Sequence, residues 1–190
     1  MGPLVVNFLA GPGAGKSTTA SAVFSLIKLH NINAELVTEI AKDFTWEQRL
    51  KTLRNQYYVW AKQQHRFWRV KDAVDVIVTD SPLFFSLVYG EQKPDCFYEL
   101  VLEEFNSYTN LNYFINRSKP YQEKGRNQTE EEAKNLDDTI KFKLEKYDIK
   151  FNDIPGTVHG VNLVVGDVLD KLNKEPLYYM GSYTDPVIGG

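Results

Sequence analysis

The stretch that decides the fold is Leu4-Val5-Val6-Asn7-Phe8-Leu9-Ala10-Gly11-Pro12-Gly13-Ala14-Gly15-Lys16-Ser17-Thr18. Residues 4–9 are almost all apolar, which is typical of a strand that is buried on both faces. Three glycines follow within five positions, and residues 17–29 then carry a pattern that predicts a helix. The sequence therefore begins with a buried strand, a tight glycine-rich turn and a helix.

The turn has the residue types of a phosphate-binding loop. Residues 10–17 fit the pattern Gly-x-x-x-x-Gly-Lys-Ser, with Ala10 where the strict form has glycine. Its glycines allow backbone conformations that turn N–H groups toward phosphate oxygens, and the following helix adds its positive end. In such a loop, Lys16 reaches the β- and γ-phosphates and the Ser17 hydroxyl ligates Mg²⁺. We expect ATP and Mg²⁺ as cofactors, with ATP held by Gly11, Pro12, Gly13, Ala14, Gly15, Lys16, Ser17 and Thr18.

The rest of the chain alternates between strand and helix patterns. Further strands are expected at residues 34–38, 74–79, 111–115 and 149–154. Helical patterns are expected at residues 45–70 (broken once), 83–89, 95–108, 129–147 and 161–172. This order predicts an α/β fold of the P-loop NTPase and nucleoside-monophosphate-kinase type: a doubly wound, mainly parallel sheet of about five strands with helices on both faces.

Length and composition fit one domain over residues 1–190. Within it we expect a lid-like segment at about 117–128, a long substrate-side helical region at about 45–70, and a tail at 173–190 without assigned structure. The net charge of -3 argues against binding nucleic acid by bulk electrostatics. Cys96 is the only cysteine, so no intramolecular disulfide can form, and we expect it to be a small core residue. No apolar stretch approaches the ~18 residues of a membrane span, which predicts no membrane partner and a cytoplasmic location.

Two carboxylates end strands at the edge where ligands bind in open α/β sheets. Asp80 follows the third expected strand, where its carboxylate could hold Mg²⁺ or accept a proton from an attacking hydroxyl. The alternative is an ordinary strand-end aspartate that caps the next turn. Glu39 ends the second strand and could bind a substrate hydroxyl, with a structural role as the alternative. We expect both to be catalytic, and Asp80 to be a metal ligand with Ser17.

A basic segment at residues 117–126 follows the fourth expected strand. Such a loop could close over the nucleotide and exclude water. Arg117 and Arg126 are the candidates for stabilising charge on the transferring phosphoryl group, because guanidinium groups stay charged and grip phosphate with two bonds. A solvated charged loop is the alternative.

The aromatic stretch at residues 45–70 is a candidate acceptor pocket, because aromatic planes stack on bases and amide side chains read base edges. Gln56, Gln63 and Gln64 are the candidate readers. The alternative for most of these residues is packing in the core.

Several motifs together resemble a known family. They are the glycine-rich loop, residues 39–42 (Glu-Ile-Ala-Lys), the glutamine-bearing helix, residues 79–82 (Thr-Asp-Ser-Pro) and the basic segment. In this order they resemble the ribosylnicotinamide-kinase-like branch of P-loop kinases over roughly residues 4 to 170, and most closely the phage 5-hydroxymethyluracil DNA kinases, which are similar to thymidylate kinases. The sequence departs from that branch at Lys42, where the branch commonly has arginine. The resemblance implies phosphorylation of a hydroxymethyl group on uracil, within DNA in a phage-infected host cytoplasm.

The sequence thus predicts a kinase that acts on a hydroxyl group of a nucleoside, nucleotide or modified base. Nicotinamide riboside or a deoxynucleotide is an alternative acceptor. A P-loop ATPase or GTPase that acts as a regulatory switch or binding module is the alternative from another class. A GTPase would be expected to carry an Asn-Lys-x-Asp run after a strand, and the sequence has none.

Overall fold

The computed structural model describes residues 2–89, 93–118 and 129–177. Its strands and helices alternate along the chain, as the sequence predicts. The elements are β1 (Leu4–Leu9), α1 (Lys16–Leu29), β2 (Ala34–Val37), α2 (Ile40–Trp46), α3 (Leu50–Leu53), α4 (Gln56–Trp68), β3 (Val76–Thr79), η1 (Leu83–Leu87), α5 (Asp95–Asn106), β4 (Thr109–Asn116), α6 (Glu130–Lys146), β5 (Asn152–Pro155) and α7 (Val158–Lys171).

The five strands form one sheet in the order β2-β3-β1-β4-β5, and every described pair is parallel. β1 lies at the centre, where Leu4 is paired with Val76 of β3 on one side and with Thr109 of β4 on the other. All six residues of β1 are buried, which explains why five of the six are apolar. The doubly wound α/β fold expected from the sequence is therefore confirmed.

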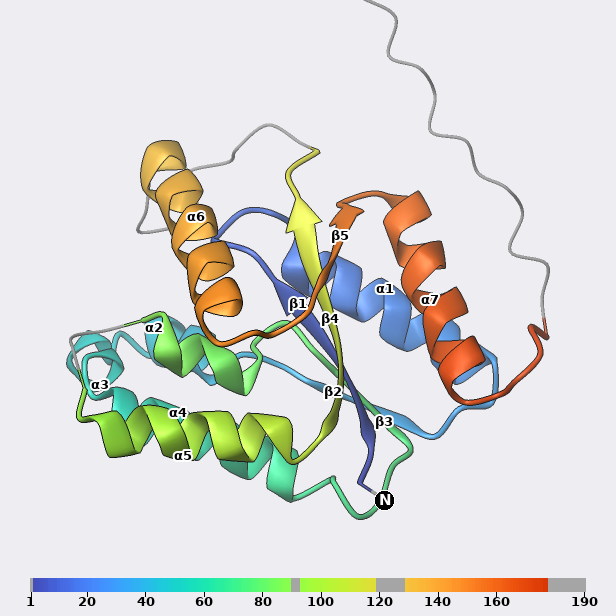
Figure 1. Ribbon diagram of the computed structural model, residues 1–190, viewed down its shortest axis with the longest axis horizontal. Helices are drawn as coiled ribbons and strands as arrows, with labels where there is room; N and C mark the ends of the chain where they lie inside the picture. The colour runs from blue at the N-terminus through green and yellow to red at the C-terminus, as the bar shows by residue number, and fades with distance from the viewer. Residues whose placement is uncertain (1, 90–92, 119–128, 178–190) are drawn as a thin grey trace, which may run out of the picture.

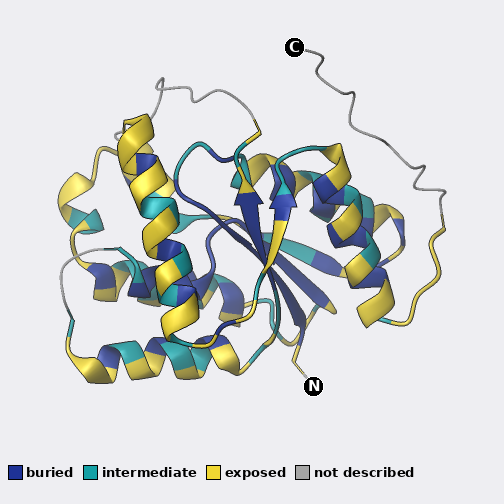
Figure 2. Ribbon diagram, turned by 45° about the horizontal axis from the view of Figure 1, so that its top comes forward, coloured by how far each residue is buried: buried dark blue, intermediate teal, exposed yellow. Residues whose placement is uncertain are grey.

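Helices cover both faces of the sheet (Figure 1). α1 and α7 lie together on one face, whereas α4, α5 and α6 lie on the other. β1 and β3 are buried throughout, the edge strands β2 and β5 are only partly buried, and the helices turn their exposed sides outward (Figure 2). The carboxyl ends of the strands meet at one edge of the sheet, which also holds the loop before α1.

Two local expectations differ from the structure. The stretch at residues 45–70 is divided among α2, α3 and α4, because Gln48 adopts a left-handed conformation (φ 57°) and the Asn55 side chain starts α4 by accepting a hydrogen bond from the Tyr58 N–H. Cys96 is exposed rather than in the core, since α5 buries the face that carries Phe97, Val101 and Phe105. Among the described residues, no helix is both long and apolar enough to cross a membrane.

Candidate functional site

The loop between β1 and α1 has the backbone geometry of a phosphate cradle. Gly13 and Gly15 have φ values of 82° and 100°, in the left-handed region that favours glycine. Gly15 is the N-cap of α1, so Lys16, Ser17 and Thr18 form the first turn of this helix. The N–H groups of a first helical turn have no partner within the helix and are free to bind an anion.

Lys16 lies inside the loop that carries it. Its Nζ donates hydrogen bonds to the carbonyl oxygens of Ala10 (2.8 Å) and Gly11 (3.1 Å), and it lies 5.6 Å from the centre of the Phe85 ring. Burial lowers the pKa of Lys16, while the negative charges of Glu39 and Asp80 act in the opposite direction. The ammonium group is therefore held at the loop among acidic groups that favour its charged form.

Asp80 follows β3, the strand paired directly with the P-loop strand β1. The residue is only 4% exposed, and its Oδ1 atom is buried without a hydrogen-bond partner in the described structure. The turn after β3 is fixed by Thr79, whose hydroxyl donates to the Val37 carbonyl oxygen (2.7 Å) and accepts from the Ser81 N–H (3.0 Å). A buried carboxylate oxygen without a partner is costly, which is consistent with a site that is completed by a ligand.

Glu39 lies in the short connection between β2 and α2, on the same edge of the sheet. Burial raises the pKa of Glu39, the charge of Lys16 opposes this shift, and the charge of Asp80 adds to it. A carboxyl group with a raised pKa binds a proton more strongly than a solvated glutamate does, which suits a residue that takes part in proton transfer.

A cavity of about 310 Å³ joins these groups. Ser17 and Ser21 of α1 form one wall, and the two carboxylates Asp80 and Glu39 are part of its lining. α2 contributes the outer wall, formed by Lys42, Asp43 and Trp46. The phosphate-binding loop and both sequence-predicted carboxylates therefore open into one space.

Comparison with known proteins identifies the family. A family model described as an AAA domain matches residues 5–160, which is most of the chain. The chain belongs to the AAA domain family. It is therefore a P-loop NTPase-type domain, and this membership indicates nucleotide binding with ATPase or kinase activity. No curated protein matches the chain.

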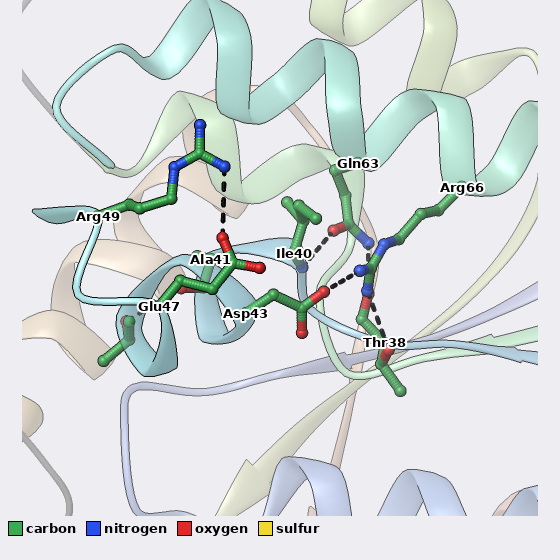
Figure 3. Close-up of polar contacts among 9 residues, drawn as sticks. Thr38, Ile40, Ala41, Asp43, Glu47, Arg49, Gln63 and Arg66 are labelled. Carbon is green, nitrogen blue, oxygen red and sulfur yellow. Dashed lines mark hydrogen bonds and ion pairs between the residues drawn. The ribbon is translucent and has the colours of Figure 1, made fainter. Parts of the chain in front are cut away.

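In this AAA domain, two side chains of α4 hold the backbone on both sides of Glu39 (Figure 3). The Gln63 Oε1 atom accepts a hydrogen bond from the Ile40 N–H (3.0 Å), and its Nε2 atom donates to the Thr38 carbonyl oxygen (3.2 Å). Arg66 donates to the same Thr38 carbonyl (3.0 Å) and pairs with Asp43. These contacts fix the position from which the Glu39 side chain reaches the cavity.

The sequence suggested glutamines that read a base, but the structure engages all three with protein groups. Gln63 is 4% exposed and holds the Glu39 loop. Gln56 is buried and donates to the Leu53 carbonyl oxygen, while Gln64 donates to Glu104 (3.0 Å). Their amides serve packing and positioning because α4 turns these residues toward neighbouring elements.

Arg117 follows β4 and lies against the base of the phosphate loop. Its Nε atom pairs with Asp137 of α6 (2.7 Å), and its Nη1 atom donates to the Pro12 carbonyl oxygen (2.8 Å). Asp137 also accepts a hydrogen bond from the Gly11 N–H (2.5 Å). The guanidinium group thus contacts the loop itself rather than standing free above it. Arg126, and the expected lid from residue 119 to residue 128, lie outside the described residues.

Asp137 is the site residue that sequence reasoning missed. It lies on the same stripe of α6 as the buried residues Ala133, Ile140 and Leu144, at spacings of four, three and four residues. A carboxylate on the apolar stripe of a helix requires a partner, and here the partners are Gly11 and Arg117. An acidic residue on the apolar stripe of a predicted helix is the sequence signal that could have indicated Asp137.

The residues of the AAA domain fit a magnesium ion. Ser17 and Asp80 line the same cavity, and one Asp80 carboxylate oxygen, Oδ1, is buried without a hydrogen-bond partner in the described structure. In the described ranges, no group of three or more His, Cys, Asp or Glu residues is arranged to hold a metal. Mg²⁺ commonly takes one or two protein oxygens and completes its shell with substrate phosphates and water, which matches this pair.

Proposed function

We propose that this AAA domain is a kinase that transfers the γ-phosphoryl group of ATP to a hydroxyl group of a nucleoside, nucleotide or modified base. The observation that carries the proposal is the cavity in which Ser17 of the P-loop meets two carboxylates, Asp80 and Glu39. Binding of ATP with Mg²⁺ accounts for Ser17 and Asp80, but it needs neither Glu39 nor the wall that α2 adds to this cavity. A cavity next to the reacting phosphate, lined by groups that can orient a hydroxyl, is what an acceptor requires.

On the donor side, the backbone N–H groups of residues 11–18 hold the phosphates, and Lys16 pairs with the β- and γ-phosphates. Ser17 and Asp80 would hold Mg²⁺, which would neutralise charge on the phosphate oxygens. The Lys16 ammonium leaves the carbonyl oxygens of Ala10 and Gly11 and exchanges them for phosphate oxygens. This exchange keeps its hydrogen bonds satisfied both with and without the nucleotide.

On the acceptor side, Glu39 accepts the proton. The acceptor oxygen forms a bond to the γ-phosphorus, and the bond from that phosphorus to the bridging β-phosphate oxygen breaks, so that ADP leaves with the electron pair. The hydroxyl proton passes to the Glu39 carboxylate. The raised pKa of Glu39 makes its ionised form a stronger base than a solvated glutamate.

Arg117 acts through the loop that binds the phosphates. Because it contacts the Pro12 carbonyl and Asp137, it supports the loop from below and adds positive charge near the nucleotide. A direct contact of Arg126 with the transferring group, from a lid, is supported by the sequence pattern alone.

For the acceptor, the sequence motifs favour 5-hydroxymethyluracil in DNA, with nicotinamide riboside and deoxynucleotides as alternatives. The test is transfer of labelled γ-phosphate from ATP with Mg²⁺ to each of these, including DNA that contains hydroxymethyluracil. The Lys16→Ala variant controls for contaminating kinases, and Glu39→Gln tests the proton acceptor. Label on any acceptor that is lost in both variants supports the proposal.

An ATPase is the second candidate, because membership in the AAA domain family is equally consistent with ATP hydrolysis. The same assay separates the two functions. The protein is an ATPase if it releases labelled phosphate, if no acceptor changes that release or takes up the label, and if Lys16→Ala abolishes it. That result would overturn the kinase proposal for the acceptors tested.

A further inference from the structure

The outer wall of the cavity combines a cation and a flat aromatic ring on one helix. Lys42 and Trp46 both line the cavity and lie four residues apart on α2, a spacing that places them on the same face. Neither residue belongs to the phosphate-binding loop or to the carboxylate pair. They are therefore in a position to contact the part of an acceptor that does not react.

Trp46 is the most exposed large apolar side chain in the described structure, at 77%. The neighbouring aromatic residues have ring partners, since Phe44 stacks on Tyr58 at 5.9 Å and Tyr57 packs edge-on against Phe97 at 4.8 Å. Within the described ranges, the Trp46 indole contacts no other aromatic ring. An indole that lines a cavity and is left open to solvent is a ready surface for stacking a planar ring.

Lys42 is the cation on this wall, and the acidic residue next to it in the sequence has another partner. The Asp43 carboxylate on the same wall is already paired with Arg66. Lys42 itself forms no ion pair with any residue that the structure describes, although it acts on Glu39 at longer range. The ammonium group is thus left available to an anionic group on the ligand.

From these two side chains we infer that the acceptor consists of a planar ring and an anionic group, as a nucleotide does, with the ring stacked on Trp46 and the phosphate paired with Lys42. This inference rests on the proposed kinase function. The volume agrees with it, because about 310 Å³ is at the lower end of the roughly 300–1,000 Å³ of small-ligand pockets. A single nucleotide therefore fits this description, either free as a nucleoside monophosphate or as one nucleotide of a single DNA strand.

Calorimetric titration tests the inference with the whole protein. Binding of a non-hydrolysable ATP analogue with Mg²⁺ is measured first, and its failure would overturn the proposed function rather than this inference. With the analogue bound, each deoxynucleoside is compared with its own 5′-monophosphate, and nicotinamide riboside with its mononucleotide. A short single-stranded oligodeoxynucleotide of each base separates the two sources of nucleotide.

The wild type is expected to prefer a monophosphate, or the oligonucleotide, over the matching nucleoside. Lys42→Gln is expected to abolish that preference, with both ligands then binding as the nucleoside does. Trp46→Ala is expected to weaken both ligands by about 5- to 150-fold, the range for loss of one stacking partner. All variants should bind the ATP analogue as the wild type does, which shows that they are folded.

Matched controls are Trp68→Ala and Lys28→Gln, an exposed tryptophan and an exposed lysine that do not line the cavity. Both controls are expected to bind every ligand like the wild type. Equal affinity of the wild type for each nucleoside and its monophosphate would overturn the inference. Unchanged affinity of Trp46→Ala for these ligands would also overturn it. The same holds if no nucleoside, monophosphate or oligonucleotide binds while the ATP analogue does.

Discussion

Replacement of Gly11 by alanine tests how tightly α6 is packed against the phosphate loop. A Cβ atom at this position would lie 2.6 Å from the Ala133 carbonyl oxygen and 3.0 Å from Asp137 Oδ1. Ordinary contact begins at 3.4 Å, so the backbone of α6 would have to withdraw by 0.8 Å. The hydrogen bond from the Gly11 N–H to Asp137, now 2.5 Å, would be stretched by about the same distance.

Overpacking of this kind costs about 1–3 kcal/mol. For a chain of this length each kcal/mol lowers the melting temperature by about 2–4 °C, so Gly11→Ala should melt about 2–12 °C below the wild type. We also expect weaker binding of ATP, because Asp137 and Arg117 would no longer hold the loop. Thermal unfolding and calorimetric titration with ATP and Mg²⁺ measure the two effects.

Gly166→Ala makes the same chemical change where the structure offers open space. Nothing lies within 4 Å of the Cβ position of this residue, which is inside α7. Its melting temperature should therefore rise, because alanine is favoured over glycine in a helix by about 0.8–1.0 kcal/mol. A Gly11→Ala protein that melts at or above the wild-type temperature, with ATP affinity unchanged, would refute the close packing of α6 on the loop.

Three further predictions concern Glu39, its support and α6. Because the pKa of Glu39 is raised in the folded protein, the unfolded chain loses this proton at a lower pH than the folded chain does. The melting temperature of the wild type should therefore fall relative to that of Glu39→Gln as the pH rises from about 4.5 through the folded pKa. Melting temperatures of the two proteins that change in parallel across this range would contradict the prediction. Gln63→Leu leaves the Ile40 N–H without its partner, so it should lower the free energy of unfolding by about 1–3 kcal/mol and also lower phosphoryl transfer. Thermal unfolding and the labelled-ATP assay measure the two effects, and the neighbouring Gln64→Leu should retain transfer. Thr129→Ala removes one half of the capping box that starts α6, so it should lower the free energy of unfolding, measured with denaturant, by about 1 kcal/mol. An unchanged unfolding midpoint would show that the cap does not stabilise the protein.

The central strand and the phosphate loop could be predicted because their signals are local. An almost entirely apolar run, a glycine-rich turn and a helical pattern lie next to one another in the sequence, and each reflects the conformation of its own residues. The parallel sheet followed from the alternation of strands and helices, and the expected boundaries of its strands lie within about three residues of those observed, whereas the helical stretch at 45–70 is divided among α2, α3 and α4.

The supports of the site could not be predicted in the same way, because they join residues that are far apart in the sequence. Gly11 and Asp137 are separated by 126 positions, and Gln63 reaches back 23 positions to Ile40. Glutamine is compatible both with reading a base and with satisfying a backbone, and only the packing of α4 decides between them. The apolar stripe of α6 did hold a local clue to Asp137, but it could not indicate which partner the carboxylate binds.

The position of β1 in the middle of the sheet has a consequence for synthesis of the protein. β1 is synthesised before both of its neighbours in the sheet, which contain Val76 and Thr109, so Leu4 waits 72 residues for one partner and 105 for the other. At about 5–20 residues per second, the second delay is roughly 5 to 20 s. During that time the five apolar residues of β1 and Asn7 lack the sheet that buries them, and the nucleotide site stays incomplete until Asp80 and Arg117 have been made. The strand that carries the phosphate loop is thus the segment for which we expect a chaperone to matter most.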